Sequence, residues 1–197
     1  MPPATHLTTP RPWSPLSDAE WTCLEPYLTR AASRPGPRIA DLRARMDAIF
    51  RIAATNDPWR LLPAEYGRPD TISRFFRRLT HEGLWQRLLA ALAERSIPDH
   101  LRALEHWICR ACRRATRILG LRFIVLIRRL GFLSALKGPP HMVPNPDLSE
   151  TIRRFPLELA FRPDMQKRGR NLAIRALMAL HRMCGGVKRI PRRLAPP

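Results

Sequence analysis

Apolar residues recur with the period of an α-helix along the chain, and its first half shows no convincing alternation typical of a β-strand. The spacing is clearest in residues 71–80, where the apolar positions i, i+3, i+4 and i+7 are Ile72, Phe75, Phe76 and Leu79. On a helix these side chains share one face and are expected to point into a core. The pattern therefore predicts an all-α protein, built as a small helical bundle.

Local signals place three other helices before residue 98. Ser17 and Glu20 have the spacing of a capping box, which predicts a helix that continues to about Thr29. A second helix is expected from about Ala40 to Ala54. A short turn at residues 81–83 leads into the last helix, whose inward side chains are expected to be Leu84, Trp85, Leu88, Leu89 and Leu92.

The connections before helix 71–80 are rich in turn residues. Pro58 and Pro63 bracket a turn-rich segment, and Asp70 is an acceptable N-cap for the helix that follows. Tryptophans at three places are expected to anchor the core rather than to stack on bases: Trp21, Trp59 and Trp85.

We expect three parts in this chain: a flexible lead at 1–16, a helical domain at 17–97, and a basic, Arg- and Pro-rich region at 98–197 that is partly helical or disordered. The region 98–197 contains one regular apolar stripe, formed by Leu101, Leu104, Ile108, Ala111, Cys112, Ala115 and Leu119. Arginines are expected to cover the rest of that helix: Arg102, Arg110, Arg113, Arg114 and Arg117. Residues 147–160 and 164–184 could each hold a further helix.

The charge balance favours a polyanionic partner. The chain has 35 basic and 16 acidic residues, a formal net charge of +19, and residues 98–197 hold 21 of the basic and 6 of the acidic ones. Such an excess opposes compaction unless a polyanion is present, so nucleic acid is the first expectation and an anionic membrane surface the second. Arginine accounts for 32 of the basic residues, which suits bidentate contacts to phosphate and guanine, although a GC-rich coding sequence explains the same bias.

Several classes of protein do not fit the sequence. The most hydrophobic stretch, 118–133, has only five consecutive residues without charge at its centre, Phe123–Ile127, whereas a membrane span needs about 20 apolar residues. The N-terminus shows no apolar run of a signal peptide, so we expect a cytoplasmic protein. Cys109 and Cys112 are the only close cysteine pair and lack a second ligand pair, so no metal site is expected there.

Helix 71–80 is the candidate for nucleic-acid recognition. Its outward face is expected to carry Thr71, Ser73, Arg74, Arg77 and Arg78. Such a helix fits the major groove, where arginine can bind guanine and serine or threonine can touch bases or phosphates. An ordinary helix with a solvated basic face has the same pattern, and this alternative stays open. The preceding helix and turn favour a helix-turn-helix-like unit, with Arg38 and Arg68 as contacts to the flanking DNA backbone.

The order of several short motifs resembles the N-terminal domain of bacterial insertion-sequence transposases of the insertion-sequence-five type. The resemblance covers residues 17–92 and rests on Trp21-x-x-Leu24-Glu25-Pro26, Arg34-Pro-Gly-Pro-Arg38, Asp41-Leu-Arg43, Met46 to Phe50, Pro58-Trp59-Arg60-x-Leu62-Pro63, Tyr66-Gly67, Asp70-Thr71 through Arg78, Gly83-Leu84-Trp85 and Leu88-Leu89. Two positions depart from it. Leu61 replaces a common acidic residue, and Leu79 replaces a frequent tryptophan.

The resemblance implies a domain that binds double-stranded DNA at the terminal inverted repeats of a mobile genetic element. In such transposases this domain precedes a catalytic domain of RNase H-like fold, in which two Asp and one Glu hold a divalent metal such as Mg²⁺. After residue 97 the acidic residues are Asp99, Glu105, Asp147, Glu150, Glu158 and Asp164, and none follows a buried strand pattern. We therefore expect no catalytic residues, metal ligands or cofactor in this chain.

Three hypotheses remain from the sequence. The first is a transposase-derived DNA-binding protein, truncated or frameshifted, which acts beside a full-length or frameshifted transposase in the bacterial nucleoid. A frameshift would explain the composition of 98–197, whereas the regular stripe in 101–119 favours a genuine basic extension. The second hypothesis is a complete transposase enzyme with an unrecognised metal site. The third is a basic amphipathic protein that binds RNA or membranes through residues 101–136.

Overall fold

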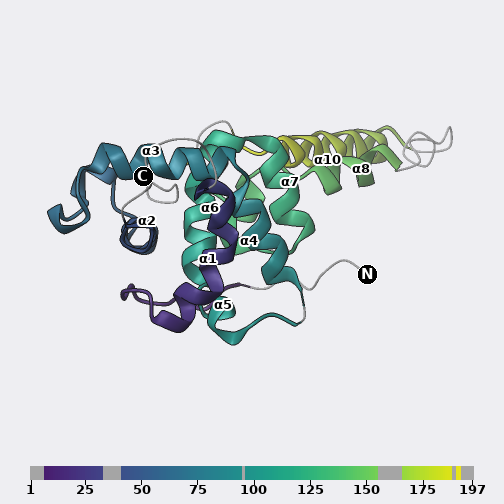
Figure 1. The fold of residues 1–197 in the computed structure, drawn as a ribbon. Coiled ribbons are helices and arrows are strands. Elements are labelled where there is room, and N and C mark those ends of the chain that lie inside the picture. Colours follow the sequence, from purple (N-terminus) through teal and green to yellow (C-terminus); the bar gives the residue numbers. More distant parts are fainter. Residues whose placement is uncertain (1–6, 33–40, 95, 155–165, 188–189, 192–197) are drawn as a thin grey trace. The chain divides into compact units, whose positions relative to one another are not determined.

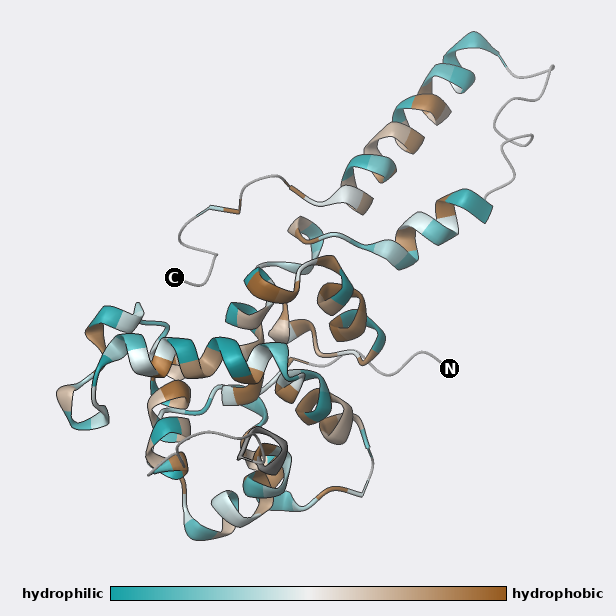
Figure 2. Ribbon diagram, turned by 45° about the horizontal axis from the view of Figure 1, so that its top comes forward, coloured by the Kyte–Doolittle hydropathy of each residue, from teal (hydrophilic) through white to brown (hydrophobic). Residues whose placement is uncertain are grey.

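The computed structural model describes residues 7–32, 41–94, 96–154, 166–187 and 190–191 (Figure 1). The protein is all-α, as the apolar spacing predicts. Two compact units divide it, one within Met1–Lys137 and one within Gly138–Leu194. Hydrophobic and hydrophilic residues alternate along the helices of both units (Figure 2), so each helix is amphipathic rather than apolar throughout.

Helix α1 (Asp18–Ala32) begins at the predicted capping box. The Ser17 hydroxyl accepts a hydrogen bond from the Glu20 amide at 3.3 Å, and the Glu20 carboxylate accepts one from the Ser17 amide at 2.9 Å. Two amides that the first turn leaves without helical partners are thereby satisfied. The helix buries Leu24 and Leu28, while Trp21 is only half-buried.

Helix α2 (Leu42–Thr55) is held at its start by Asp41, whose carboxylate accepts a hydrogen bond from the Ala44 amide at 2.8 Å. It supplies a large share of the core through Met46, Ala48, Ile49, Phe50, Ile52 and Ala53. Asn56 follows in the left-handed conformation, with φ of 63°, and stops the helix.

Two 3-10 helices, η1 (Trp59–Leu61) and η2 (Ala64–Tyr66), connect α2 to α3 (Pro69–His81). The predicted N-cap, Asp70, is wrong: Arg68 occupies the cap without a side-chain hydrogen bond, and Asp70 lies in the first turn. Pro69 explains the difference, because its fixed φ and missing N–H suit the first helical position.

The predicted turn between α3 and α4 (Leu84–Ala93) is confirmed. Gly83 has φ of +78°, which a residue with a side chain adopts only with strain. All the side chains predicted to point inward from α4 are buried: Leu84, Trp85, Leu88, Leu89 and Leu92. Trp85 also donates a hydrogen bond to the Thr80 hydroxyl at 2.8 Å, and Thr80 donates to the Phe76 carbonyl.

The first unit continues beyond residue 97, where the sequence analysis placed the end of the domain. Helices α5 (Asp99–Ala103), α6 (Glu105–Leu119) and α7 (Leu121–Arg129) and the 3-10 helix η3 (Leu133–Ala135) follow within it. Helix α6 packs against α2, α3, α4 and α7. Its buried face includes Trp107 and Ile108, each with none of its surface exposed. The bundle is therefore built around α6.

The lead expected to be flexible is docked on this bundle from Thr8 onward, where Thr8 bonds to Ser134 and Glu105. The Leu16 side chain is buried, and its amide donates to the Asp47 carboxylate at 2.8 Å. Arg11 pairs with Glu20 at 2.6 Å and places its guanidinium 4.0 Å from the ring centroid of Trp107. These partners come from distant helices, so the local sequence did not reveal them.

The second unit contains the 3-10 helix η4 (Pro140–Met142) and the helices α8 (Pro146–Arg154) and α10 (Lys167–Gly185), which pack on each other. Both helices overlap the segments predicted to hold them, but α8 begins one residue before 147–160 and α10 ends one residue after 164–184. Gly186 closes the unit: a Cβ there would lie 2.8 Å from the Met142 carbonyl oxygen, so only glycine fits. Across the described parts of the chain, none of the helices has the length and apolarity that a membrane crossing requires.

Candidate nucleic-acid interface

The outer face of α3 carries the residues predicted to meet DNA. Thr71, Arg74 and Arg77 are exposed, Ser73 is half-buried, and Arg68 is exposed at the N-terminal end of the helix. The remaining candidate in this group, Arg78, is half-buried, whereas Arg38 lies outside the described residues. The helix thus gathers all the described candidates along one element.

The opposite face of α3 fixes this orientation. The side chains predicted to point inward are buried, each with 4% or less of its surface exposed: Ile72, Phe75, Phe76 and Leu79. Phe76 lies between two tryptophans, with ring centroids 5.4 Å from both Trp59 and Trp85. Because the buried aromatic rings prevent rotation about the helix axis, Arg74 and Arg77 must point away from the core.

Arg78 differs from Arg74 and Arg77. Its Nε lies 3.7 Å from a carboxylate oxygen of Glu82, and its guanidinium lies 5.3 Å from the ring centroid of Phe75. An arginine held by a carboxylate and an aromatic face has less to offer an external phosphate. Among the three arginines of α3, Arg74 and Arg77 are therefore the better candidates for contacting DNA.

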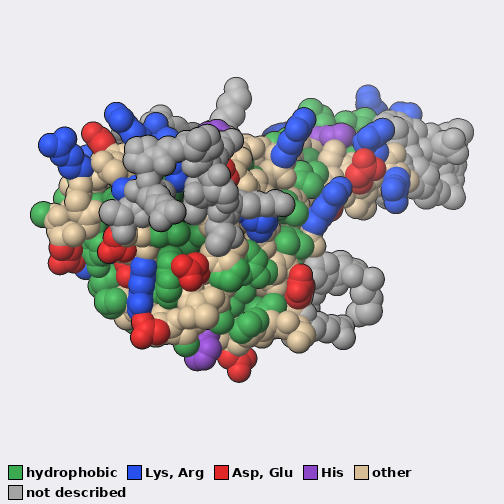
Figure 3. All heavy atoms as spheres, in the orientation of Figure 1, with side chains coloured by type: hydrophobic (Ala, Val, Ile, Leu, Met, Phe, Trp, Pro, Cys, Tyr) green, Lys and Arg blue, Asp and Glu red, His purple; other side chains and the backbone are tan. Residues whose placement is uncertain are grey.

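The surroundings of α3 combine both signs of charge. Lys and Arg side chains (blue in Figure 3) project from the face near the position of α3 in Figure 1, with acidic side chains (red) beside them. Asp70 is exposed in the first turn of the helix. The basic character of this face is thus local to the arginine positions.

The connection between α2 and α3 is longer than the turn of the expected helix-turn-helix. That motif joins its two helices by a turn of about three or four residues, whereas residues 56–68 between α2 and α3 contain η1 and η2. The tight turn follows α3 instead of preceding it. Helix α3 is supported by α2, α4 and α6 together.

The arginines predicted to cover the rest of α6 differ in exposure: Arg117 is exposed, Arg110 and Arg113 are half-buried, and Arg114 is buried. Arg114 is only 6% exposed and donates from Nη2 to the carbonyl oxygens of Ile52, at 3.1 Å, and Asp57. Arg110 donates from Nε to the Ala53 carbonyl at 3.2 Å. These two arginines thereby satisfy carbonyls at the C-terminal end of α2, where a cation is also favoured by the helix dipole.

Burial lowers the pKa values of Arg113 and Arg114. Burial, followed by the positive charges of Arg117 and Arg110, lowers the pKa of Arg114 to about 10. Burial also lowers the pKa of Arg113, whose Nε donates to the Ser134 carbonyl at 2.7 Å. Arg113 and Arg114 remain protonated at neutral pH, and part of their donors bind carbonyls of the protein.

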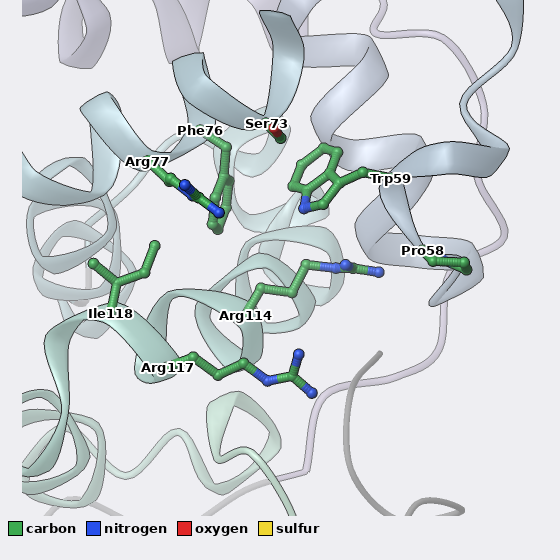
Figure 4. Close-up of a pocket in the computed structure, with 8 residues that line it drawn as sticks. All are labelled: Pro58, Trp59, Ser73, Phe76, Arg77, Arg114, Arg117 and Ile118. Atoms are coloured by element: carbon green, nitrogen blue, oxygen red, sulfur yellow. The ribbon is translucent and has the colours of Figure 1, made fainter. Parts of the chain in front are cut away.

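A pocket of about 290 Å³ lies at the junction of η1, α3 and α6 (Figure 4). Its walls include Trp59 and three arginines: Arg77 from α3, and Arg114 and Arg117 from α6. Trp59 was predicted as a core anchor, but it is only half-buried and borders this pocket. No sequence pattern predicted the pocket. The one available signal was the position of Arg114, which lies between Ala111 and Ala115 at the edge of the buried stripe.

Cys109 and Cys112, the close cysteine pair of the sequence, are both buried. No group of three or more His, Cys, Asp or Glu residues described here could hold a metal ion. Burial raises the pKa of the Cys109 thiol to about 12, and that of Cys112 well above its usual value. These thiols therefore stay protonated, whereas a zinc ligand or a nucleophile must be a thiolate.

The packing of α6 also bears on the hypothesis of an amphipathic segment at 101–136. Its apolar face is buried against the other helices of the first unit, with Leu104, Trp107 and Ile108 fully covered. A membrane-surface helix would need that face free. The burial of this face therefore argues against the membrane part of that hypothesis, and RNA binding stays a prediction.

Comparison with known proteins bears on the first unit. Residues 16–89 match a family described as "Putative transposase of IS4/5 family (DUF4096)". No curated protein and no solved structure matches the chain. The matched segment contains α2 and α3 whole, and with them every described residue predicted to meet DNA. Residues 16–89 are thus similar to the transposases of the IS4/5 family, which confirms the resemblance found in the sequence.

Proposed function

We propose that this chain binds double-stranded DNA at the terminal inverted repeats of an insertion element, through the outer face of α3. One observation carries the proposal: a buried apolar face holds Arg74 and Arg77 outward on a helix that lies within the transposase-like segment. A helix of this kind can enter the major groove, whose width accepts it.

Each residue of the face has a role in this proposal. Arg74 and Arg77 bind guanine O6 and N7 or the phosphates, and Thr71 and Ser73 contact bases or phosphates through their hydroxyls. Arg68, beside the first turn of α3, contacts the flanking phosphate backbone. The first amides of the helix add a favourable site for an anion there. Arg78 contributes less, because Glu82 and Phe75 already engage it.

Arg38 remains a proposed flanking contact, since it lies outside the described residues. The proposal assigns DNA binding, not strand cleavage, to the described residues. Cleavage, with its divalent metal, would come from a transposase beside which this chain holds the element ends. This division of labour places the protein at the bacterial nucleoid.

The direct test selects binding sites from a pool of randomised duplexes and then measures affinity for the selected site by fluorescence anisotropy. We expect the selected duplex to bind more tightly than random duplex at moderate salt. Arg74→Ala with Arg77→Ala should remove the preference, whereas Arg122→Ala, an exposed arginine on α7, should retain it. Equal affinity for selected and random duplexes would refute sequence-specific recognition.

A further inference from the structure

The proposed contact between the outer face of α3 and a DNA duplex gives no role to Trp59 or to the α6 arginines in the walls of the neighbouring pocket. We propose that this pocket binds a single nucleotide, with the phosphate held by the arginines and the base resting against Trp59. The inference rests on the proposed function, because Ser73 and Arg77 belong both to the outer face of α3 and to the pocket wall. It adds a ligand class and a second binding mode to that face.

Trp59 supplies the flat apolar wall. One neighbour is the Phe76 ring, 5.4 Å away between centroids, and another is the Arg114 guanidinium, 5.4 Å from the indole centroid. The indole remains half-exposed and borders the hollow (Figure 4). Stacking on an aromatic side chain accepts any base, since every base has a π-face. At about 290 Å³, the pocket is close to the lower end of the range for small-molecule sites, roughly 300 Å³.

The polar walls are cationic. Arg77 enters from α3, and Arg114 and Arg117 enter from α6, so that three guanidinium groups surround the hollow (Figure 4). No Asp or Glu is among the described residues that line it. Guanidinium groups match the geometry of phosphate oxygens in bidentate fashion. The walls therefore select an anion that also has a planar part.

Arg114 provides a second, independent indication of a ligand. Its side chain is nine-tenths buried, with 6% of the residue exposed, and its Nη2 is occupied by the carbonyls of Ile52 and Asp57. Its Nε is buried without a hydrogen-bond partner in the described structure. A buried donor without an acceptor is costly, and such groups commonly mark a functional site. An anion in the pocket would also offset the repulsion from Arg117, which helps to lower the pKa of Arg114.

A nucleotide can reach the pocket from two sources. It can be an unpaired nucleotide of a DNA strand lying along α3, or a free nucleotide from solution. Both combine a phosphate with a planar heterocycle, which is the chemistry that the walls select. Inorganic phosphate and a nucleoside each supply only half of it, and they serve as matched probes.

The first experiment titrates the full chain with adenosine monophosphate, adenosine and inorganic phosphate by calorimetry. We expect adenosine monophosphate to bind at least about tenfold more tightly than either half-ligand, as one stacked base contributes that much. Trp59→Leu and Arg117→Gln should each weaken its binding about tenfold, whereas Trp59→Phe retains a ring and should restore most of it. Arg122→Gln removes one exposed charge outside the pocket and should have no effect.

The second experiment distinguishes the sources by comparing a blunt duplex with the same duplex carrying one unpaired terminal nucleotide. An advantage of the unpaired end that disappears in Trp59→Leu and Arg117→Gln identifies a DNA strand as the source. Binding of adenosine monophosphate without that advantage identifies a free nucleotide. Thermal melting of each variant verifies that the bundle is intact.

The two proposals fail differently. Arg74→Ala should weaken duplex binding and leave adenosine monophosphate binding unchanged, because Arg74 does not line the pocket. If duplex binding is absent but the pocket variants lose adenosine monophosphate, the DNA-binding proposal fails and the pocket stands. If folded Trp59→Leu and Arg117→Gln proteins bind both ligands as the unaltered chain does, the nucleotide site is refuted.

Discussion

Helices α3 and α6 share an amphipathic pattern with several arginines, but the arginines have different partners. Both carry an apolar stripe on one side and several arginines on the other. In α3, Arg74 and Arg77 extend into solvent, whereas in α6 the guanidinium of Arg114 is buried against main-chain carbonyls. The difference lies in the neighbours. Helix α6 passes the C-terminal end of α2, whose carbonyls accept hydrogen bonds from Arg110 and Arg114.

The number of arginines in a region does not by itself show how many of them are available to a polyanion. A count of arginines makes residues 98–197 the more basic half, with 21 basic and 6 acidic residues. Three of those arginines, Arg110, Arg113 and Arg114, donate to main-chain carbonyls within the first unit. These arginines keep their charge, but some of their N–H donors already bind carbonyls of the protein. The number of arginines in 98–197 therefore overstates how many of their donors are free for an external partner.

The largest expected effect comes from removing the best-buried arginine. Arg114→Leu leaves the carbonyls of Ile52 and Asp57 without their donor, so the free energy of unfolding should fall by about 3 kcal/mol. Urea denaturation measures this, with Arg122→Leu, an exposed arginine on α7, as control within about 0.5 kcal/mol of the unaltered chain. Equal stability of the two variants would abolish the distinction between the helices.

The complementary change on α3 should affect DNA binding and leave stability unchanged. Arg74→Ala with Arg77→Ala removes two exposed cations, so the affinity for the selected duplex should fall at least about tenfold. The slope of log affinity against log salt should shrink by up to about 2, because up to two phosphate contacts are lost. An unchanged salt slope would mean that the two arginines do not meet the phosphates.

A third arginine environment sharpens the comparison, since Arg11 pairs with a carboxylate instead of a carbonyl. Burial raises the pKa of Glu20, but the Arg11 hydrogen bond, the Ser17 amide and the charge of Arg11 outweigh it and lower this pKa below its ordinary value of 4.5. Ionised Glu20 therefore stabilises the fold above the pKa of the unfolded chain, and this contribution is lost as the pH falls through the lower folded pKa.

Glu20→Gln should accordingly lower the free energy of unfolding by about 1–2 kcal/mol at pH 7. The difference from the unaltered chain should diminish as the pH falls below about 4.5. Urea denaturation at a series of pH values measures it, with Glu25→Gln, an exposed carboxyl on the same helix, as control. A difference that stays constant with pH would contradict the assigned role of the ion pair.

The smallest effect is expected at Arg78, the intermediate case. Glu82 and Phe75 already engage its guanidinium, so Arg78→Gln should weaken duplex binding by less than about threefold. The ion pair, at 3.7 Å, should contribute less than about 1 kcal/mol to stability. Anisotropy titrations that find Arg78→Gln as harmful as Arg74→Gln would place Arg78 inside the interface.

Local patterns predicted the features that depend on neighbours in sequence. The buried set of α3, the inward face of α4 and the reciprocal bonds of Ser17 and Glu20 are all as expected, because helical spacing alone fixes them. Asp70 was misjudged only because Pro69 competes for the start of the same helix.

The features that depend on distant partners could not be read from the sequence. The residues beside Arg11 in the sequence do not indicate its contact with Trp107. Those beside Leu16 do not indicate its hydrogen bond to Asp47. Trp107 is not part of the apolar stripe predicted for 101–119, and it is fully buried. The period of 101–119 indicates which side of α6 is apolar and not which carbonyls lie opposite, so it did not predict the carbonyl contacts of Arg110 and Arg114.

The carbonyl contacts of Arg110 and Arg114 set an order of events during synthesis. The ribosome completes α2, α3 and α4 before it makes α6, so the end of α2 and the apolar sides of these helices wait for a segment beyond residue 89. A nascent chain in that interval exposes surface that chaperones recognise. The first unit can therefore reach its native state only after residue 119 has left the exit tunnel.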